Sequence, residues 1–175
     1  MEIRREGRVW KFGDDVNTDL IFPNRAFREP LEEQHRFVFS ANRPGWIAAV
    51  QPGDLIVAGQ NFGMGSGRPV GRLLAECGIA GVMAESVNGL CLRNCVRFGL
   101  PALSAPGVTA LFDEGDLARV DFVEGWLENL SRDGASLDAA GLPPLLRDLV
   151  TSGGIIQMLV EEGFVEPMPR ITASS

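Results

Sequence analysis

The chain has 175 residues, of which 45% are hydrophobic and 22% charged, a composition typical of one globular domain covering residues 1–175. Its formal net charge is −7, and the acidic residues are scattered rather than grouped in runs. Because nucleic-acid binding needs a basic face, this charge argues against a nucleic-acid partner, but not against a small anion held by a local arginine.

Membrane insertion and secretion are not expected from the sequence. Its apolar stretches fall short of the roughly 20 residues that a bilayer-spanning helix needs, and residues 1–6 lack the apolar segment of a signal peptide. The three cysteines are Cys77, Cys91 and Cys95. This odd, sparse set favours reduced thiols in a cytoplasmic protein.

Cys91 and Cys95 are spaced i, i+4 on a predicted helix, so they could form half of a metal site. The chain has one histidine, His35, and no fourth soft ligand close to the pair. Buried thiols are therefore the favoured interpretation, and no metal ligand is assigned. His35 is interpreted as a loop or surface residue.

The first part of the chain predicts one strand followed by irregular structure. Residues 8–12 alternate in polarity as a strand does, and Gly13-Asp14-Asp15 is a turn signal. Residues 16–23 are predicted to be extended, 24–30 to form a loop and 32–39 to be helical.

The best-defined unit lies in the middle of the chain. It consists of a short buried strand at 54–58, a glycine loop at 61–67, a helix at 69–77 and a second buried strand at 79–84. Pro69 in the first helical turn and Gly78 just after the last turn match the usual ends of a helix. A strand, helix and strand with short links predict a parallel crossover. A helix at 87–98 and a strand at 100–103 follow.

The C-terminal part predicts a hairpin and two helices. Residues 115–122 and 126–130 form the hairpin, expected on the surface-facing side. The helices span about 144–150 and 155–162, with a break at Gly153-Gly154. The prediction is an α/β domain with a mixed sheet and helices on one side.

The glycine loop, residues 61–71 (NFGMGSGRPVG), predicts an anion site. A loop that leads into a helix gathers unpaired backbone N–H groups, and glycines such as Gly65 and Gly67 let a ligand approach them closely. Arg68 adds a planar charged fork that suits a carboxylate or phosphate. The loop lacks the third glycine of a dinucleotide site and the Gly-Lys-Ser/Thr of a P-loop. Ser66 either faces the ligand or only caps the helix.

Several segments in order resemble one known family. These are residues 13–23 (GDDVNTDLIFP), 52–63 (PGDLIVAGQNFG), Gly65-Ser66, Arg93-Asn94, 99–101 (GLP) and Gly153-Gly154. Together they are similar to the small subunit of 3-isopropylmalate dehydratase, the swivel domain of the aconitase family. The resemblance extends from about residue 7 to 163.

The resemblance implies a β/β/α three-layer swivelling domain and a hydro-lyase that removes and re-adds water on a hydroxy di- or tricarboxylate substrate. It also implies a [4Fe–4S] cluster held by a large partner subunit, so that the cysteines of this chain are not its ligands. A cytoplasmic heterodimer is expected.

Matched to the family motifs, Ser66 falls on the catalytic base, Arg68 on a substrate-carboxylate ligand and Asp19 on the active-site network. Arg28 falls in the specificity loop and matches a reader of a distal carboxylate. A serine removes a C–H proton only as an alkoxide, so it needs concentrated positive charge, which Arg68 beside a helix start would supply. If Glu29 or Glu33 neutralises Arg28, an apolar substituent at that place becomes plausible instead.

The chain departs from the family in two segments that should be spatial neighbours. Gly67 replaces a second serine, Pro69-Val70-Gly71 replaces Glu-His-Ala, and residues 85–90 (ESVNGL) replace Lys-Ser-Phe-Ala-Arg-Ile, so that Gly89 stands for the arginine. These changes indicate either a divergent substrate or a decayed site. The alternatives are another diacid, such as dimethylmalate, methylmalate or homoaconitate, and a non-catalytic carboxylate-binding or regulatory module.

Overall fold

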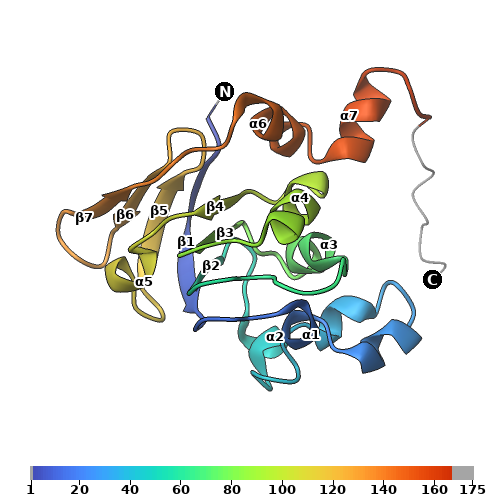
Figure 1. Ribbon diagram of the computed structural model, residues 1–175, viewed down its shortest axis with the longest axis horizontal. Helices are drawn as coiled ribbons and strands as arrows, with labels where there is room; N and C mark the ends of the chain where they lie inside the picture. Colours follow the sequence, from blue (N-terminus) through green and yellow to red (C-terminus); the bar gives the residue numbers. More distant parts are fainter. Residues whose placement is uncertain (1, 167–175) are drawn as a thin grey trace.

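The computed structural model describes residues 2–166, which form a seven-stranded mixed sheet in the order β4-β3-β2-β1-β5-β6-β7 (Figure 1). The first four strands are parallel: β1 (Arg4–Lys11), β2 (Leu55–Ala58), β3 (Gly81–Ala84) and β4 (Ala102–Ser104). The last three are antiparallel: β5 (Leu117–Asp121), β6 (Trp126–Asn129) and β7 (Ala135–Asp138).

Two hydrophobic cores lie on opposite faces of the parallel strands. Ile56 and Val82 belong to the core that includes Leu73 and Leu74 of α3 (Val70–Glu76) and the buried cysteines of α4 (Gly89–Arg97). Neighbouring residues of the same strands face the other core, which the antiparallel strands complete; its members include Leu55, Val57, Met83, Val120, Phe122 and Leu127. Parallel strands buried on both faces are continuously apolar, as β2 and β3 are.

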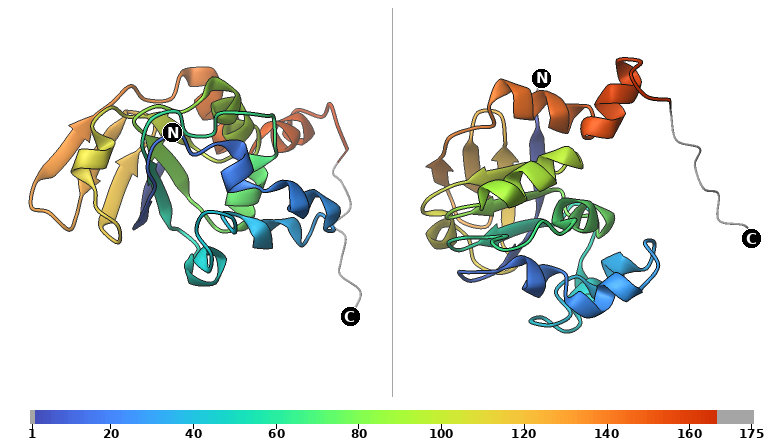
Figure 2. Two further views of the ribbon diagram at one scale, coloured as in Figure 1. Left: turned by 60° about the horizontal axis from the view of Figure 1, so that its bottom comes forward. Right: turned by 45° about the vertical axis from the view of Figure 1, so that its right-hand side comes forward.

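The layers are therefore β/β/α, as the family resemblance implies. Figure 2 (left) shows the antiparallel strands in yellow and orange, then the parallel strands, then α3 and α4. The predicted crossover from β2 through α3 to β3 is confirmed, as are the strand at β4 and the helix at α4. The hairpin of β5 and β6 is confirmed, but it joins the central sheet through β1, and residues of its inner face, Val120 and Leu127, are buried.

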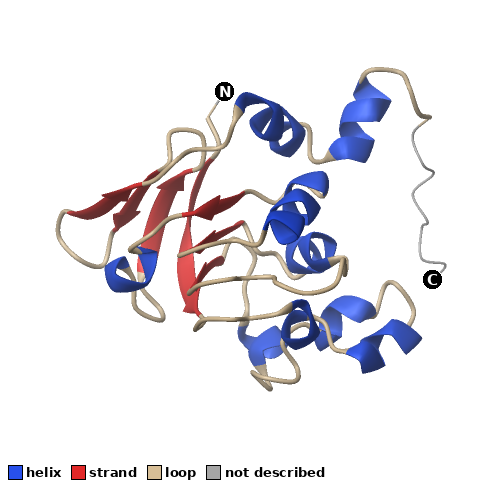
Figure 3. Cartoon of the chain, in the orientation of Figure 1, coloured by secondary structure: helices blue, strands red, loops and turns tan. Residues whose placement is uncertain are grey.

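The expectation of helices on one side is wrong. α5 (Val108–Leu111) packs on the opposite face, where Val108 and Phe112 join the second core. Further helices are α2 (Trp46–Ala49), α6 (Pro144–Thr151) and α7 (Ile155–Glu161), of which the last two match the predicted pair. Figure 3 shows most helices on the side of α3 and α4. None of the helices within residues 2–166 is both long and apolar enough to cross a membrane.

The N-terminal segment also differs from the prediction. Residues 16–23 were expected to be extended, but α1 (Thr18–Ile21) is a helical turn because the Asn17 side chain accepts a hydrogen bond from the Leu20 N–H at 2.9 Å. The predicted loop contains the 3₁₀ helix η1 (Asn24–Arg28). A helix is predicted at residues 32–39, and the structure has a shorter 3₁₀ helix there, η2 (Gln34–Phe37).

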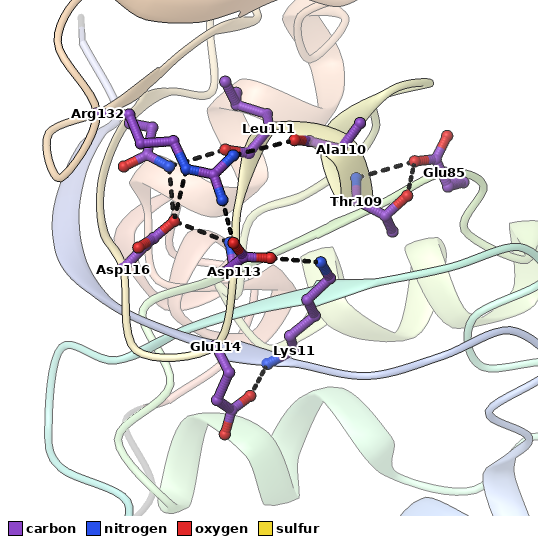
Figure 4. A network of polar contacts seen from close by, with 10 residues as sticks. Lys11, Glu85, Thr109, Ala110, Leu111, Asp113, Glu114, Asp116 and Arg132 are labelled. Atoms are coloured by element: carbon purple, nitrogen blue, oxygen red, sulfur yellow. Dashed lines mark hydrogen bonds and ion pairs between the residues drawn. The ribbon is translucent and has the colours of Figure 1, made fainter.

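A polar network fixes the end of β1, from which the chain runs toward α1 (Figure 4). Lys11 Nζ lies 3.2 Å from Asp113, and Arg132 pairs with both Asp113 and Asp116. Asp113 is 66% exposed, so these ion pairs contribute little stability one by one. Asn129 is buried and donates to Asp116 at 2.7 Å, which ties the network to β6.

We expect Gly81→Ala to destabilise the contact between the two β layers. A Cβ at Gly81 would lie 2.3 Å from Cζ of the Phe122 ring, which is itself fully buried. Overpacking of this kind costs about 1–3 kcal/mol, measurable as a lower urea midpoint. Gly13→Ala is the matched control, because nothing lies within 4 Å of a Cβ there. Equal midpoints for the two variants would contradict the tight layer contact.

Candidate active site

The glycine loop between β2 and α3 lies against the segment that forms α1. The Gly63 N–H donates to the Val16 carbonyl at 2.7 Å, and the Thr18 N–H donates to the Met64 carbonyl at 2.8 Å. These backbone bonds bring residues nearly fifty positions apart in sequence to one place. The predicted loop and the Thr18-Asp19 pair therefore form one site.

Glycine is required at two positions of this loop. Gly65 has a φ of 114°, and a Cβ there would lie 2.9 Å from Thr18 Oγ1. Gly63 has a φ of 74°, and its Cβ would lie 2.2 Å from Cys91 Sγ. Both the left-handed backbone and the close contacts exclude a side chain, so the glycines set the distance between the loop and α1.

Ser66 is exposed, and its hydroxyl lies between two side chains. Its Oγ is 3.1 Å from Arg68 Nε, which donates to it, and 3.4 Å from Thr18 Oγ1. The alternative that Ser66 caps α3 is wrong, since Pro69 precedes that helix without a side-chain cap. The Gly71 N–H at the start of α3 donates instead to Asn94 Oδ1 of α4 at 2.8 Å.

Arg68 is buried, with 8% of its side chain exposed. Besides Ser66, its guanidinium donates to the Phe22 carbonyl, to Asp19 and to Asn24 Oδ1, the last at 3.0 Å. The cation also lies 5.3 Å from the centre of the Phe27 ring. Asp19, in contrast, is 58% exposed. The site thus holds a fixed buried cation with one carboxylate partner at the surface.

Arg28 is exposed at the end of η1, the helix whose Asn24 and Phe27 contact Arg68. Among the described residues Arg28 forms no ion pair with Glu29 or Glu33, and Glu33 pairs with Arg36 at 2.6 Å instead. The structure therefore brings the segment of Arg28 beside Ser66 and Arg68.

The sequence alone does not point to Asn24 and Phe27 as partners of Arg68. No local pattern marks a polar or aromatic loop residue as the partner of an arginine more than forty positions away.

The family departures have structural explanations. Gly67 leaves space, since the nearest atom to its Cβ would be Leu90 Cδ2 at 3.8 Å, and this contact confirms that the two divergent segments are neighbours. Gly71 allows α3 to approach α4, where a Cβ would lie 2.5 Å from the Asn94 carbonyl oxygen. Gly89 also leaves space, with Arg93 Nη1 nearest at 3.6 Å.

Glu85, at the position of the family's lysine, caps α5. Its carboxylate accepts hydrogen bonds from the Gly107 N–H at 2.7 Å and the Thr109 N–H at 2.9 Å (Figure 4 shows the Thr109 bonds). Burial raises the pKa of Glu85, but the hydrogen bonds from Thr109 and Gly107 outweigh it and hold the pKa below its usual value. This residue therefore supports the fold rather than the site.

The cysteines behave as buried thiols. Cys91 Sγ and Cys95 Sγ are 4.0 Å apart, and burial raises the pKa of Cys77 to about 12, which makes its thiol unreactive. Within residues 2–166 no group of three or more His, Cys, Asp or Glu side chains could hold a metal ion. The donor set does not fit an iron–sulfur cluster in this part of the chain.

Comparison with known proteins identifies close relatives. The chain is 38% identical over 159 residues to "3-isopropylmalate dehydratase small subunit 1" of Methanopyrus kandleri, covering 90% of this chain and 93% of that protein. It is also 38% identical to the "Isopropylmalate/citramalate isomerase small subunit" of Methanocaldococcus jannaschii, over 88% of this chain and 92% of the relative. A scan against protein-family models finds no match.

The fold has a solved counterpart. A crystal structure of 3-isopropylmalate dehydratase from Methanocaldococcus jannaschii superposes with a TM-score of 0.85 at 28% identity, covering 91% of this chain and 95% of that one. The similarity in fold therefore extends over most of the chain.

We expect serine to be tolerated at residue 67 but not at residue 65. Gly67→Ser meets open space, so its melting temperature should stay within about 1 °C of the original. Gly65→Ser combines a left-handed φ with a contact to Thr18 Oγ1; strain of about 1–3 kcal/mol lowers Tm by roughly 2–4 °C per kcal/mol in a chain of this size. Equal thermal melts would contradict the close approach of loop and α1.

Proposed function

Because this chain belongs to the family of 3-isopropylmalate dehydratase small subunits, we propose that it is the small subunit of a hydro-lyase that isomerises a hydroxy di- or tricarboxylate such as 3-isopropylmalate. The observation that supports this best is the hydrogen bond from the buried Arg68 Nε to the exposed Ser66 Oγ at 3.1 Å. An exposed hydroxyl that accepts a hydrogen bond from a buried cation supports the assignment of Ser66 as the base.

Ser66 acts as the base in this proposal. Removal of a C–H proton needs the serine alkoxide, and a cation within hydrogen-bond distance stabilises that charge strongly where water is excluded. Arg68 is fixed by four partners, so little reorganisation is needed when the alkoxide forms. The Thr18 hydroxyl, 3.4 Å from Ser66 Oγ, is close enough to orient it once the site tightens around a substrate.

The substrate carboxylates are proposed to meet two arginines. The exposed carboxylate of Asp19 occupies one edge of Arg68, and a substrate carboxylate of the same chemistry can exchange with it there. Arg28 is exposed without an ion pair to Glu29 or Glu33, which suits it to read a further carboxylate. Gly65 and Gly67 are both exposed beside Ser66, and at Gly67, where the nearest atom to an added Cβ would be 3.8 Å away, the loop leaves room for a ligand.

A large partner subunit in the cytoplasm is proposed to hold the [4Fe–4S] cluster. Cys77, Cys91 and Cys95 are buried within the cores of this chain and do not form a ligand set. When bound, the cluster would supply a Lewis acid for the hydroxyl group that leaves. This chain would contribute the base and the carboxylate ligands, so each subunit alone is incomplete.

Other diacids, such as dimethylmalate, methylmalate or homoaconitate, fit the same arrangement, since they share the hydroxy-carboxylate core. A non-catalytic carboxylate-binding module would need Arg68 and Arg28 but would have no use for the hydroxyl of Ser66. The two functions therefore differ in what Ser66 does.

Ser66→Ala should remove most of kcat in the assembled, cluster-loaded enzyme while KM stays nearly unchanged. Loss of a general base costs on the order of 10²–10⁴-fold, and the hydroxyl adds little to ground-state affinity beside Arg68. The measurement is steady-state and single-turnover kinetics of the anaerobic complex, with the small subunit alone as the blank.

Ser136→Ala is the matched control, because Ser136 is exposed on β7, outside the glycine loop. Ser136→Ala should melt as the original chain does. Ser66→Ala leaves the buried Arg68 Nε–H without its acceptor and should cost about 1–3 kcal/mol of stability, so its thermal melt is checked to lie above the assay temperature. Near-original turnover of the Ser66 variant would remove Ser66 from the mechanism.

Arg28→Ala should change which substrate is accepted more than it lowers turnover on the best one. A lost hydrogen bond to a charged group costs about 1.5–3 kcal/mol, so kcat/KM should fall roughly 10–150-fold for malates whose third-carbon substituent ends in a carboxylate. Malates with an alkyl group there should change by less than about 3-fold. Arg25→Ala in the same helix, where Arg25 bonds Ser40 at 3.1 Å, is the control. An equal fall in kcat/KM for all substrates would exclude a role of Arg28 in recognising the distal carboxylate.

A further inference from the structure

Three residues of one short segment hold the Arg68 side chain from different directions. The Phe22 carbonyl accepts a hydrogen bond from Nη1, Asn24 Oδ1 accepts one from Nη2 at 3.0 Å, and the Phe27 ring lies 5.3 Å from the guanidinium carbon. We call Phe22, Asn24 and Phe27 the Arg68 clamp. The clamp belongs to the segment that ends in Arg28. The residues that hold Arg68, the hydrogen-bond partner of Ser66, therefore lie in the same segment as the proposed specificity residue.

Asn24 differs from the other acceptors of Arg68. The Phe22 carbonyl is backbone and Asp19 carries a charge, whereas the Asn24 amide is neutral. Nη2 has two hydrogens, so it can donate to Asp19 and Asn24 at the same time. Two acceptors on one nitrogen fix the rotation of the planar guanidinium, and that rotation decides where Nε points.

We propose that Asn24 is a positioning residue, which keeps Arg68 Nε on Ser66 Oγ and couples the Arg28 segment to the base. The catalytic part of this inference rests on the proposed function of Ser66. Asn24 does so without neutralising Arg68, because an amide oxygen accepts a hydrogen bond and brings no charge. It also holds Arg68 when a substrate carboxylate replaces Asp19, since its bond does not depend on that carboxylate.

The first test needs no substrate. In the isolated chain labelled with ¹⁵N, the Arg68 Nε–Hε proton should exchange slowly with water, because it is buried and bonded to Ser66. Asn24→Ala should speed this exchange by about tenfold or more, whereas Arg25→Ala, whose side chain bonds Ser40 instead, should leave it unchanged. Asn24→Asp keeps an acceptor oxygen and should restore slow exchange. Equal exchange in all four proteins would overturn the positioning role.

The second test uses the assembled enzyme. Asn24→Ala should lower kcat about tenfold at neutral pH with KM changed less than about threefold, and the rising limb of the kcat–pH profile should move to higher pH, because a loosened Arg68 stabilises the alkoxide less. Asn24→Asp should move the limb further, since a second carboxylate beside Arg68 offsets its charge. A profile identical to that of the original enzyme in both variants contradicts the inference.

The double variant separates the inference from the proposed function. If Asn24 acts through Ser66, adding Asn24→Ala to Ser66→Ala should lower the residual turnover less than about twofold, and additive losses would overturn the coupling. If Ser66→Ala keeps full turnover, the proposed function fails, yet the exchange of Arg68 Hε still decides whether Asn24 fixes Arg68. Thermal melts of each variant exclude unfolding as the cause of any loss.

Discussion

The burial of the Arg68 guanidinium is the constraint on which the rest of the site depends. A buried cation without partners is very unfavourable, so the chain must bring acceptors to it. These come from the loop of Arg68 itself, through Ser66, and from residues 19–24, which lie 44 to 49 positions earlier in sequence. The need to satisfy one guanidinium thereby fixes α1, the start of η1 and the glycine loop relative to one another.

Small residues make this convergence possible. Gly63 sits against Cys91 of α4, Gly65 against Thr18 of α1, and Gly71 lets α3 approach α4. Asn94 Oδ1 then accepts a hydrogen bond from the Gly71 N–H, in the first turn of α3, across that contact. The loop is therefore held on both sides, by α1 and by α4, and Ser66 remains the exposed hydroxyl between them. The departure from the family at Gly71 belongs to this packing, whereas Glu85 caps α5.

The sequence predicted the parts of the fold that short, strongly apolar runs and helix-end residues mark. The β2–α3–β3 crossover followed from residues 54–84, where Pro69 and Gly78 mark the helix ends. α1 was missed because four residues are too few to show a helical period, and its cap, Asn17, also suits a turn. In the site, the roles of Ser66, Arg68 and Asp19 came from the resemblance. The contact of Asn24 with Arg68 depends on tertiary packing, which leaves no periodic trace in the sequence.

The contact between Gly81 and the Phe122 ring has a consequence for how such chains diverge. With a Cβ at residue 81 only 2.3 Å from the ring, the two positions share one fixed volume between the β layers. A lineage that acquires alanine or a larger residue at 81 must accept a smaller side chain at 122 to keep both layers packed. Residues 81 and 122 should therefore covary among relatives. This covariation reflects how the second β layer packs and does not depend on changes at the site.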